Sequence, residues 1–565
     1  MIPADHIHPH LRRPSVSRAY DGTMTEHYKL VPGFLGIDIG TQGLSAIFCD
    51  QDLRVLATGE GSYGFATTED EQKRGFYEQL SSDWLAAVKG AMQEIHQQFA
   101  KQQKRIQVLA CGISGQMHGE VLIDESGRTL EPVRIWCDAR NAVEADELTN
   151  TFQFKVPKRS TCARFLWTAR NRPHLAKRTA HITTPAGWLA HVLTGDYCLG
   201  SGDAAGIFPV NSQTQNYDKT FLQKFDEIIS RTECGKDIPS IEELLPNLAR
   251  AGEYAGFINT YGADILGIPF DEDTTKIPMA AAEGDQVASL AGSLIGKSGV
   301  VACSFGTSVC ANVVADASGP QFQGVSPAVD HFTSADGKPI HMIWIRNGTT
   351  FMNAILESYG SMLPKDTNPF TEILPDLINA PPDCGGLLAL PFMDDEPGLG
   401  VSSGGSALVV GWNAQNRKPG NVAKAALLST IFNLKNGVQV LERQNVETRS
   451  IVLSGGLVKT PQTGQIVADV FNLPVTLLQA ADEGCSWGAS VLAKYRHRCF
   501  INNSQEPGWV EFLEGVEATK IGNSSGKVSF VPNGDSVRVY EDMYHKHKML
   551  LSLEPQLRNI INTDL

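Results

Sequence analysis

The chain has 565 residues, of which 42% are hydrophobic and 19% charged, and its formal net charge is −14. This length and composition indicate a globular protein with more than one domain, and the acidic balance argues against nucleic-acid partners. No apolar run approaches the roughly 18 residues that a membrane helix needs. The eleven cysteines have no paired spacing, and the sequence contains neither a CxxC pair nor an HExxH motif. We therefore expect a cytoplasmic location and no structural zinc.

Residues 1–32 differ from the rest of the chain. They are polar and weakly basic, with His6, His8 and His10 among several Arg, Ser and Pro residues. We expect a disordered leader, and Met24 as the true first residue is an alternative. Acidic residues and the lack of an amphipathic run argue against a transit peptide.

From residue 33 the hydrophobic pattern predicts a β-meander followed by α/β units. Glycine-bearing turns separate the first strands, and the expected elements are strands at 34–39, 44–48, 54–57 and 107–113 and helices at 82–100 and 186–193. A loop rich in Gly and Asp is expected to follow, up to residue 206.

The same order of elements recurs in the second half. Strands are predicted at 300–305, 309–314, 341–345, 451–453 and 475–478, and helices at 422–444, 462–471 and 488–495. A surface helix at 540–553, ended by Pro555, follows. The repetition predicts an α/β fold of two duplicated domains, residues 33–295 and 296–565, with a cleft between them.

One carboxylate stands at a strand-to-helix turn near the middle of the chain. Residues 283–286 read EGDQ, between an apolar run and a helical pattern of small residues. Asp285 is therefore placed to accept a proton from a substrate hydroxyl. On local grounds alone, an N-cap is the commoner role for an Asp before a helix.

A glycine-bearing turn at residues 38–43 favours the catalytic interpretation. Glycine lets the backbone of Gly40, Thr41 and Gln42 approach a phosphate closely, and the Thr hydroxyl can donate to it. Asp38, at the end of the preceding strand, can hold Mg²⁺ directly or through water. An ordinary hairpin is the alternative.

Two turns in the second half match the first one. Gly306 and Thr307 form a hairpin whose amides could hold the outer phosphates of ATP, and Gly455 and Gly456 lie between a strand and a helix, as in nucleotide sites. Close packing explains either turn equally well alone. The three turns together indicate a phosphoryl-transfer site.

Polar side chains follow two predicted strands of the first half. Residues 114–119 read SGQMHG, where Met117 offers an apolar wall and His118 a hydrogen-bonding group for a sugar. Trp136 stands before Asp138 and Arg140, a combination that suits a polyol. A solvated loop and a structural Asp–Arg ion pair are the alternatives.

Two further motifs do not support other functions. Residues 291–298 end in GKS, but a helical pattern precedes them and a strand follows, which is the reverse of a P-loop. Residues 484–488 match the GxSxG of serine hydrolases, yet the few histidines after Ser486 lie in polar sequence. Small residues that open a helix near a nucleotide explain this motif better.

Taken in order, these motifs resemble the FGGY carbohydrate kinases, and GQMHG resembles their xylulokinase branch most. The resemblance implies two ribonuclease-H-like domains of the actin and hexokinase type, and ATP-dependent phosphorylation of a ketose, D-xylulose first. By this likeness Asp285 is the general base, and Asp38 binds Mg²⁺. The ketose would contact Asp285, Met117, His118, Trp136 and Gln286, and ATP would contact Gly40, Thr41, Gln42, Gly306, Thr307, Gly455, Gly456 and Lys459.

The sequence also departs from the family pattern. Ser45 stands where the first hairpin usually has Lys or Arg, and residues 393–397 replace the usual Gly-Glu-Arg-Thr-Pro stretch. Sedoheptulose or ribulose as the substrate, and a sugar-binding regulator with weakened catalysis, therefore stay open. The expected partners are a sugar and MgATP; a homodimer is neither required nor excluded.

Overall fold

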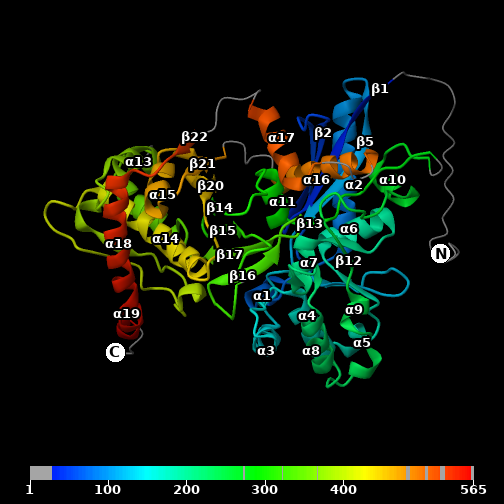
Figure 1. Cartoon of the computed structure of the whole chain (residues 1–565), viewed down its shortest axis with the longest axis horizontal. Helices are drawn as coiled ribbons and strands as arrows, with labels where there is room; N and C mark the ends of the chain where they lie inside the picture. Colours follow the sequence, from blue (N-terminus) through cyan, green and yellow to red (C-terminus); the bar gives the residue numbers. More distant parts are fainter. Residues whose placement is uncertain are drawn as a thin grey trace.

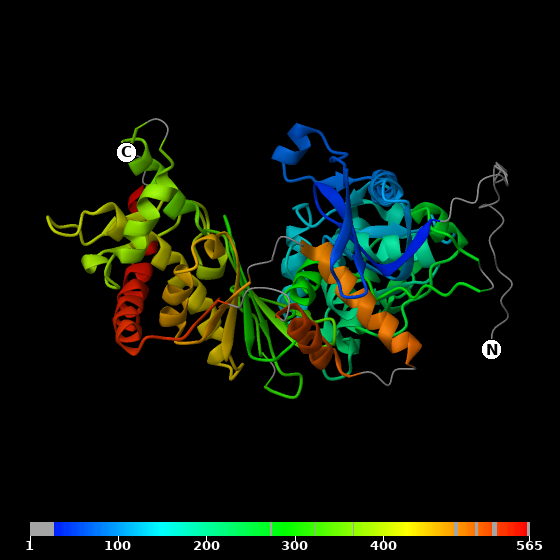
Figure 2. The same ribbon diagram turned by 90° about the horizontal axis from the view of Figure 1, so that it is seen from above.

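Two sheets, each carrying its own helices, form the two halves of the molecule (Figures 1 and 2). The computed structural model describes residues 28–271, 274–320, 322–364, 367–478, 484–502, 507–521 and 528–561. The first sheet has the strand order β13-β5-β1-β2-β3, and the second has the order β16-β17-β15-β14-β20-β21-β22. The predicted α/β fold is confirmed.

The first sheet begins as the sequence predicts. β1 (Lys29–Ile39), β2 (Gly43–Asp50) and β3 (Val55–Ser62) form an antiparallel meander. β5 (Lys104–Gly115) and the short β13 (Glu283–Gly284) add parallel strands beyond β1. Because β1 starts at Lys29, the predicted leader is too long at its end; residues 1–27 lie outside the described residues.

The chain between β3 and β13 forms helices and short strands that pack beside the first sheet (Figure 1). The short strands pair among themselves in separate two-stranded sheets. The helices are α1 (Glu69–Lys73), α2 (Ser81–Ala100), α3 (Ala142–Phe152), α4 (Thr161–Asn171), α5 (Pro173–Ala176), α6 (Pro185–Thr194), α7 (Ser201–Ile207), α8 (Lys219–Ile229), α9 (Ile241–Leu244) and α10 (Thr260–Leu266). The short strands are β4 (Glu78–Gln79), β6 (Val121–Ile123), β7 (Val133–Arg134), β8 (His181–Thr183), β9 (Cys198–Gly200), β10 (Val210–Asn211), β11 (Asn216–Tyr217) and β12 (Asn247–Ala249). The loop predicted up to residue 206 is wrong, because β9 and α7 together occupy most of it.

The second sheet repeats the meander with one additional strand. β14 (Val300–Phe305), β15 (Val309–Val314) and β17 (Pro339–Ile345) are antiparallel neighbours, and β16 (Val329–Thr333), which the sequence pattern did not predict, pairs with β17 at the edge. On the other side of β14 lie β20 (Ser450–Gly455), β21 (Val475–Leu477) and β22 (Val528–Phe530).

The second half has helices of its own, of which α14 is buried along most of its length. They are α12 (Thr350–Gly360), α13 (Pro369–Asn379), α14 (Pro419–Glu442), α15 (Thr463–Phe471), α18 (Gly534–Ser552) and α19 (Glu554–Ile561), with β18 (Leu388–Leu390) and β19 (Leu408–Val410) beside them. α18 buries Tyr540, Met543, Tyr544 and His547. It is therefore a packed helix, not the predicted surface helix, and Pro555 lies in the first turn of α19.

α16 (Gly484–Ile501) comes late in the chain but packs on the first sheet, across β1 and β5 and along α11 (Asp285–Gly292) (Figure 2). α17 (Trp509–Ile521) belongs to the apolar cluster that α16 and α11 form with the first sheet. Glycines allow this approach: a Cβ on Gly36 would lie 2.0 Å from the carbonyl oxygen of Ser486, and one on Gly488 would lie 1.9 Å from that of Ala288. The GxSxG motif is therefore a small-residue contact between helices and a sheet. The predicted domain boundary between residues 295 and 296 stays a prediction. α16 lies after this boundary in the sequence but packs on the sheet of the first half.

Replacing Gly488 with Ala is expected to destabilise the protein by about 1–3 kcal/mol, because backbone atoms of α11 would have to move. Gly90, on the exposed side of α2, is the matched control, since a Cβ there meets nothing within 4 Å. Gly90→Ala should stabilise the helix by about 0.5–1 kcal/mol. Urea unfolding of both variants measures the difference, and equal midpoints would contradict the close contact.

Candidate functional site

Two carboxylates gather where the parallel strands of the first sheet end. Asp38 in β1 lies opposite Ser114 in β5, and Ser114 lies opposite Glu283 in β13. Asp285 follows β13 directly and opens α11. Because the carboxyl ends of neighbouring parallel strands meet at one edge, this edge is the usual ligand-binding side of an α/β sheet.

Asp285 is the first residue of α11, and Gly284 is its N-cap. The N-cap alternative for Asp285 is therefore wrong. Its carboxylate Oδ1 accepts a hydrogen bond of 2.7 Å from the backbone N–H of Gln286. Burial, with a smaller contribution from the charge of Asp38, raises the pKa of Asp285 to about 7. A carboxyl group with this pKa exchanges protons readily at neutral pH.

Asp38 is half-buried, and its Oδ1 is enclosed without a hydrogen-bond partner among the described residues. Burial raises its pKa, and the neighbouring Ser114 hydroxyl opposes this effect. A carboxylate oxygen left unpaired in a partly buried site fits a cation, because Mg²⁺ is commonly held by one or two carboxylates and by phosphate oxygens. No cluster of three or more His, Cys, Asp or Glu suited to a metal occurs within the described ranges.

The first glycine turn is held rigidly. Gly40 N–H donates to the carbonyl of Gly43 at 2.9 Å, and the Tyr63 hydroxyl donates to the carbonyl of Gly40 at 2.7 Å. The indole Nε1 of Trp136 donates to Oγ1 of Thr41 at 2.9 Å, so Trp136, 43% exposed, lies beside this turn. Gln42 is exposed, and Ser45 lies opposite Asp38 in β2.

The other two glycine turns lie side by side on the second sheet. Phe305 pairs with Gly455 in the parallel register of β14 and β20, so Gly306 and Thr307 extend from the same edge as Gly455 and Gly456. Gly455 has a φ of 82°, and a Cβ there would lie 2.4 Å from the carbonyl of Phe305. Lys459, at the end of the short helical turn Gly456–Lys459, is exposed. The structure thus brings together the two turns that the sequence placed about 150 residues apart.

Unpredicted residues brace the Gly306–Thr307 turn. The N–H of Gly348 donates to the carbonyl of Thr307 at 2.9 Å, and the N–H of Thr349 donates to that of Gly306 at 3.0 Å. A Cβ on Gly348 would lie 2.5 Å from the Thr307 carbonyl. Glycine is therefore required here, although its place before a helix gave no local signal.

His118 is already hydrogen-bonded through both ring nitrogens. Nδ1 lies 3.0 Å from the carbonyl of Gly206, and Nε of Arg159 donates to Nε2 at 3.2 Å. Nδ1 therefore carries the proton. Burial, followed by the charge of Arg159, lowers the pKa of His118 to about 3. Met117 is buried beneath Gly284, where an added Cβ would lie 2.2 Å from its Cγ.

Gln286 reaches across to the second sheet. Its Oε1 accepts from Nδ2 of Asn312 at 3.2 Å, and Sγ of Cys310 lies 3.8 Å from the same oxygen. Trp344 pairs with Cys310 in the antiparallel register of β15 and β17, so both side chains lie on the same face of the sheet. Trp344 is 43% exposed. The sequence reasoning missed this aromatic residue, because a single Trp in an apolar strand looks like part of the core.

The sequence reasoning also missed a buried carboxylate pair next to Asp285. Glu283 accepts from the N–H of Asp203 at 2.9 Å, and Thr184 Oγ1 donates to Asp203 Oδ2 at 2.5 Å. Burial, together with the charge of Asp285, raises the pKa of Asp203 to about 8. This pair fixes α7 against β13 and so supports the backbone that carries Asp285.

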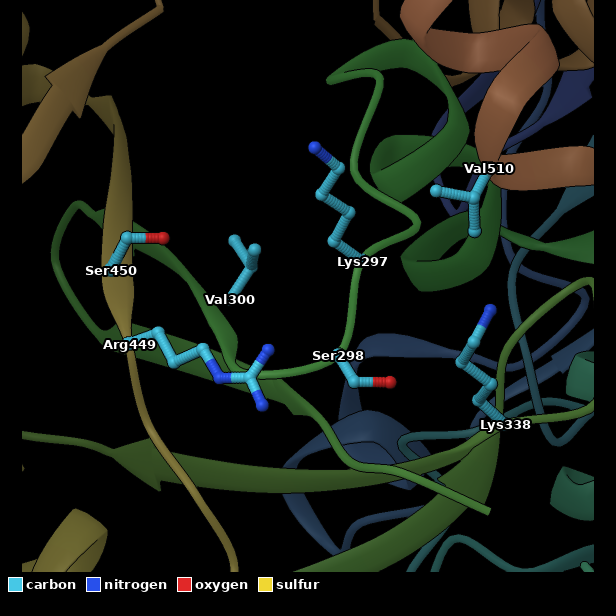
Figure 3. A pocket seen from close by; sticks show the side chains of 7 residues that line it. All are labelled: Lys297, Ser298, Val300, Lys338, Arg449, Ser450 and Val510. Atoms are coloured by element: carbon cyan, nitrogen blue, oxygen red, sulfur yellow. The ribbon is translucent and has the colours of Figure 1, made fainter. Parts of the chain in front are cut away.

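A separate cavity of about 310 Å³ lies at the opposite end of the second sheet, against α17 (Figure 3). Its lining is Lys297, Ser298, Val300, Lys338, Arg449, Ser450 and Val510. Each cation has an acidic partner: Lys297 pairs with Glu514, Lys338 with Asp336 and Arg449 with Glu447. The cavity is thus charge-balanced, and we place the candidate active site at the two carboxylates instead.

Residues 34–292 match the FGGY family of carbohydrate kinases, N-terminal domain, and residues 301–497 match the C-terminal domain of the same family. The chain belongs to the FGGY carbohydrate kinases. The resemblance seen in the sequence is therefore confirmed, and this kinase family uses ATP. Among the described helices of this FGGY kinase, none has the length and apolar character to cross a bilayer.

Curated relatives of this FGGY kinase include xylulose kinases. That of Haemophilus influenzae is 25% identical over 535 residues, covering 92% of this chain and 99% of the relative. That of Bacillus subtilis is 23% identical over 542 residues, covering 94% and 98%. The FGGY kinase is thus xylulokinase-like along nearly its whole length.

Solved structures show the same fold with more than one substrate name. A xyloylose kinase from Brucella ovis has a TM-score of 0.73 at 20% identity, covering 93% of this chain and 99% of its own. A gluconate kinase from Lactobacillus acidophilus has a TM-score of 0.73 at 18% identity, covering 94% and 100%. A glycerol kinase from Plasmodium falciparum has 0.72 at 17%, covering 93% and 99%. The fold alone therefore does not select the sugar.

Proposed function

We propose that this FGGY kinase phosphorylates a ketose with ATP, and that D-xylulose, giving D-xylulose 5-phosphate, is its preferred substrate. One observation carries the proposal: Asp285, with its pKa raised to about 7, stands beside Asp38 at the strand ends of the first sheet. Gln286 next to it contacts the second sheet, which carries the Gly306–Thr307 and Gly455–Gly456 turns. The names of the curated relatives support xylulose among the ketoses.

In this mechanism Asp285 acts as the general base. Its carboxylate takes the proton of the sugar hydroxyl while that oxygen forms a bond to the γ-phosphorus of ATP, and the bond from γ-phosphorus to the bridging oxygen of ADP breaks. The proton ends on Asp285. Backbone amides of the three glycine turns would bind the phosphates. The N–H groups of Gly40 and Gly306 are bonded within their own turns, so the amides of Thr41 and Thr307 would serve there, beside the Gly455–Gly456 turn.

Asp38 is the residue that would hold Mg²⁺, through the carboxylate oxygen that has no hydrogen-bond partner in the described part of the chain. When bound, Mg²⁺ supplies charge neutralisation on the phosphates. Gln42 and Lys459 are exposed near their turns and would contact the nucleotide.

On the sugar side, Gln286 uses its Oε1 within the protein and keeps its amide Nε2 to donate to a sugar hydroxyl. Trp136 offers a ring face, since its N–H is bound to Thr41. Met117 contributes a buried apolar wall beneath Gly284. His118 uses both ring nitrogens for Gly206 and Arg159, so it would shape the sugar site.

A coupled assay of ADP release with a substrate panel tests the proposed function. The panel contains D-xylulose, D-ribulose, sedoheptulose, gluconate and glycerol, each with MgATP. We expect the highest kcat/KM with D-xylulose, by about tenfold or more over the others. A higher value for gluconate or glycerol would overturn the ketose assignment. Sugar binding in a thermal-shift assay without any turnover would instead indicate a regulator.

A further inference from the structure

Asp330 connects the two halves of the molecule at the sugar side of the candidate site. It lies in β16, the edge strand of the second sheet, and is 7% exposed. Its Oδ1 pairs with Nζ of Lys155 at 2.7 Å, and its Oδ2 pairs with the guanidinium of Arg159. Both cations belong to the first half of the chain, between α3 and α4.

Two cations meet one carboxylate at this junction. Burial alone would raise the pKa of Asp330, but Arg159 and Lys155 hold it below its ordinary value. Lys155 also donates to the carbonyl of Pro327 at 2.6 Å, and Ser201 Oγ donates to the carbonyl of Ser334 at 3.0 Å. The two halves therefore meet along β16 through polar contacts that depend on their relative position.

Arg159 uses a different nitrogen for each of its two partners. One terminal nitrogen pairs with Asp330, and Nε donates to Nε2 of His118. Because a guanidinium is planar, fixing one nitrogen fixes the direction of the other N–H groups. The hydrogen bond at Nε2 in turn leaves the ring proton on Nδ1, toward Gly206.

We infer that Asp330 is a positioning residue: from the second half of the chain it orients Arg159, which fixes the ring of His118 beside the sugar. This inference rests on the proposed function, in which the sugar binds next to His118. Its consequence is that the sugar side of the site is complete only while the two halves are together. Nucleotide contacts on the glycine turns do not depend on it.

The test compares Asp330→Asn with Asp336→Asn. Asp336 is the matched control, because it lies in the same β16–β17 hairpin and pairs with Lys338 away from His118. We expect Asp330→Asn to raise the KM for the ketose about tenfold or more and to leave the KM for ATP within about twofold. Asp336→Asn should change neither. Equal ketose KM values for both variants would overturn the inference.

Two further measurements keep the inference falsifiable if Asp330→Asn folds poorly or if no ketose is turned over. Arg159→Lys keeps a cation for Asp330 but loses the Nε–H donor, and it should raise the ketose KM as well. The ¹⁵N resonances of the His118 ring report the bond at Nε2 without any turnover. They should shift in Asp330→Asn and Arg159→Lys and stay unchanged in Asp336→Asn; unchanged resonances in all three would exclude the positioning role.

Discussion

Replacing Asp285 with Asn is expected to lower kcat by about 10²–10⁴, the usual contribution of a positioned general base. Asparagine keeps an oxygen that can accept from the N–H of Gln286, so the start of α11 is preserved. The change therefore removes the proton acceptor without removing the local hydrogen bond. Sugar-dependent ADP release by wild type and variant measures the effect.

The pH dependence of wild-type activity provides a second test of Asp285 as the general base. A general base works only when ionised, and the pKa of Asp285 is raised to about 7. In the free enzyme, kcat/KM should therefore fall as the pH drops below about 7 and level off above it. The residual activity of Asp285→Asn should lack this acidic limb.

Ser486→Ala is the control for Asp285→Asn. Ser486 is buried in α16 against Gly36, and its replacement should leave turnover unchanged. If activity survived in Asp285→Asn and disappeared in Ser486→Ala, the kinase mechanism would be wrong and the GxSxG motif would need another explanation.

The sequence was most informative where a glycine stands at the end of a strand. The turns at Gly40, Gly306 and Gly455 lie at strand ends, and a strand end with a glycine has a local signature in the sequence. Gly306 and Gly455 lie side by side because neighbouring parallel strands place their carboxyl ends at one edge of a sheet. The same rule places Asp38 and Asp285 together at the strand ends of the first sheet.

The sequence was misleading where tertiary packing decides the local structure. Residues 201–207 read as a loop because they are small and include two glycines, yet Gly202 is packed so closely that a Cβ would lie 2.4 Å from Val287. The helix α7 forms because Glu283 accepts from its first N–H groups. The sequence near residue 201 gives no indication that Glu283, about 80 residues away, is the hydrogen-bond acceptor.

The same limit applies to the junction at Asp330. Arg159 and Asp330 are 171 residues apart, and each stands in a segment with no recognisable motif. Charged residues in such segments are usually solvated, so the local interpretation would have been a surface charge. Only the arrangement of β16 against the first half shows that a buried Asp330 pairs with a half-buried Arg159 beside His118.

Replacing Asp38 with Asn should weaken activation by Mg²⁺ about 10- to 100-fold, the loss typical for an outer-shell residue that holds a metal through water. It should not lower the melting temperature, because burial disfavours the charged form of Asp38 and Asn carries no charge. Titrating Mg²⁺ at saturating sugar and ATP measures the effect. Asp50→Asn is the control: Asp50 lies at the opposite end of the same sheet, and Asn keeps its acceptor for the N–H of Arg54.

Asp38→Asn should also change the pH profile of kcat/KM. The direction of that change distinguishes a local electrostatic role of Asp38 from general damage to the protein. The negative charge of Asp38 contributes to the raised pKa of Asp285. Removing that charge favours the ionised form of Asp285, so the acidic limb of kcat/KM should move to lower pH in Asp38→Asn. A limb that stayed in place, together with unchanged Mg²⁺ activation, would show that the two carboxylates do not act on one another. Weaker Mg²⁺ activation with a shifted limb would place both residues at one phosphoryl-transfer centre, with Asp38 toward the metal and Asp285 toward the sugar hydroxyl.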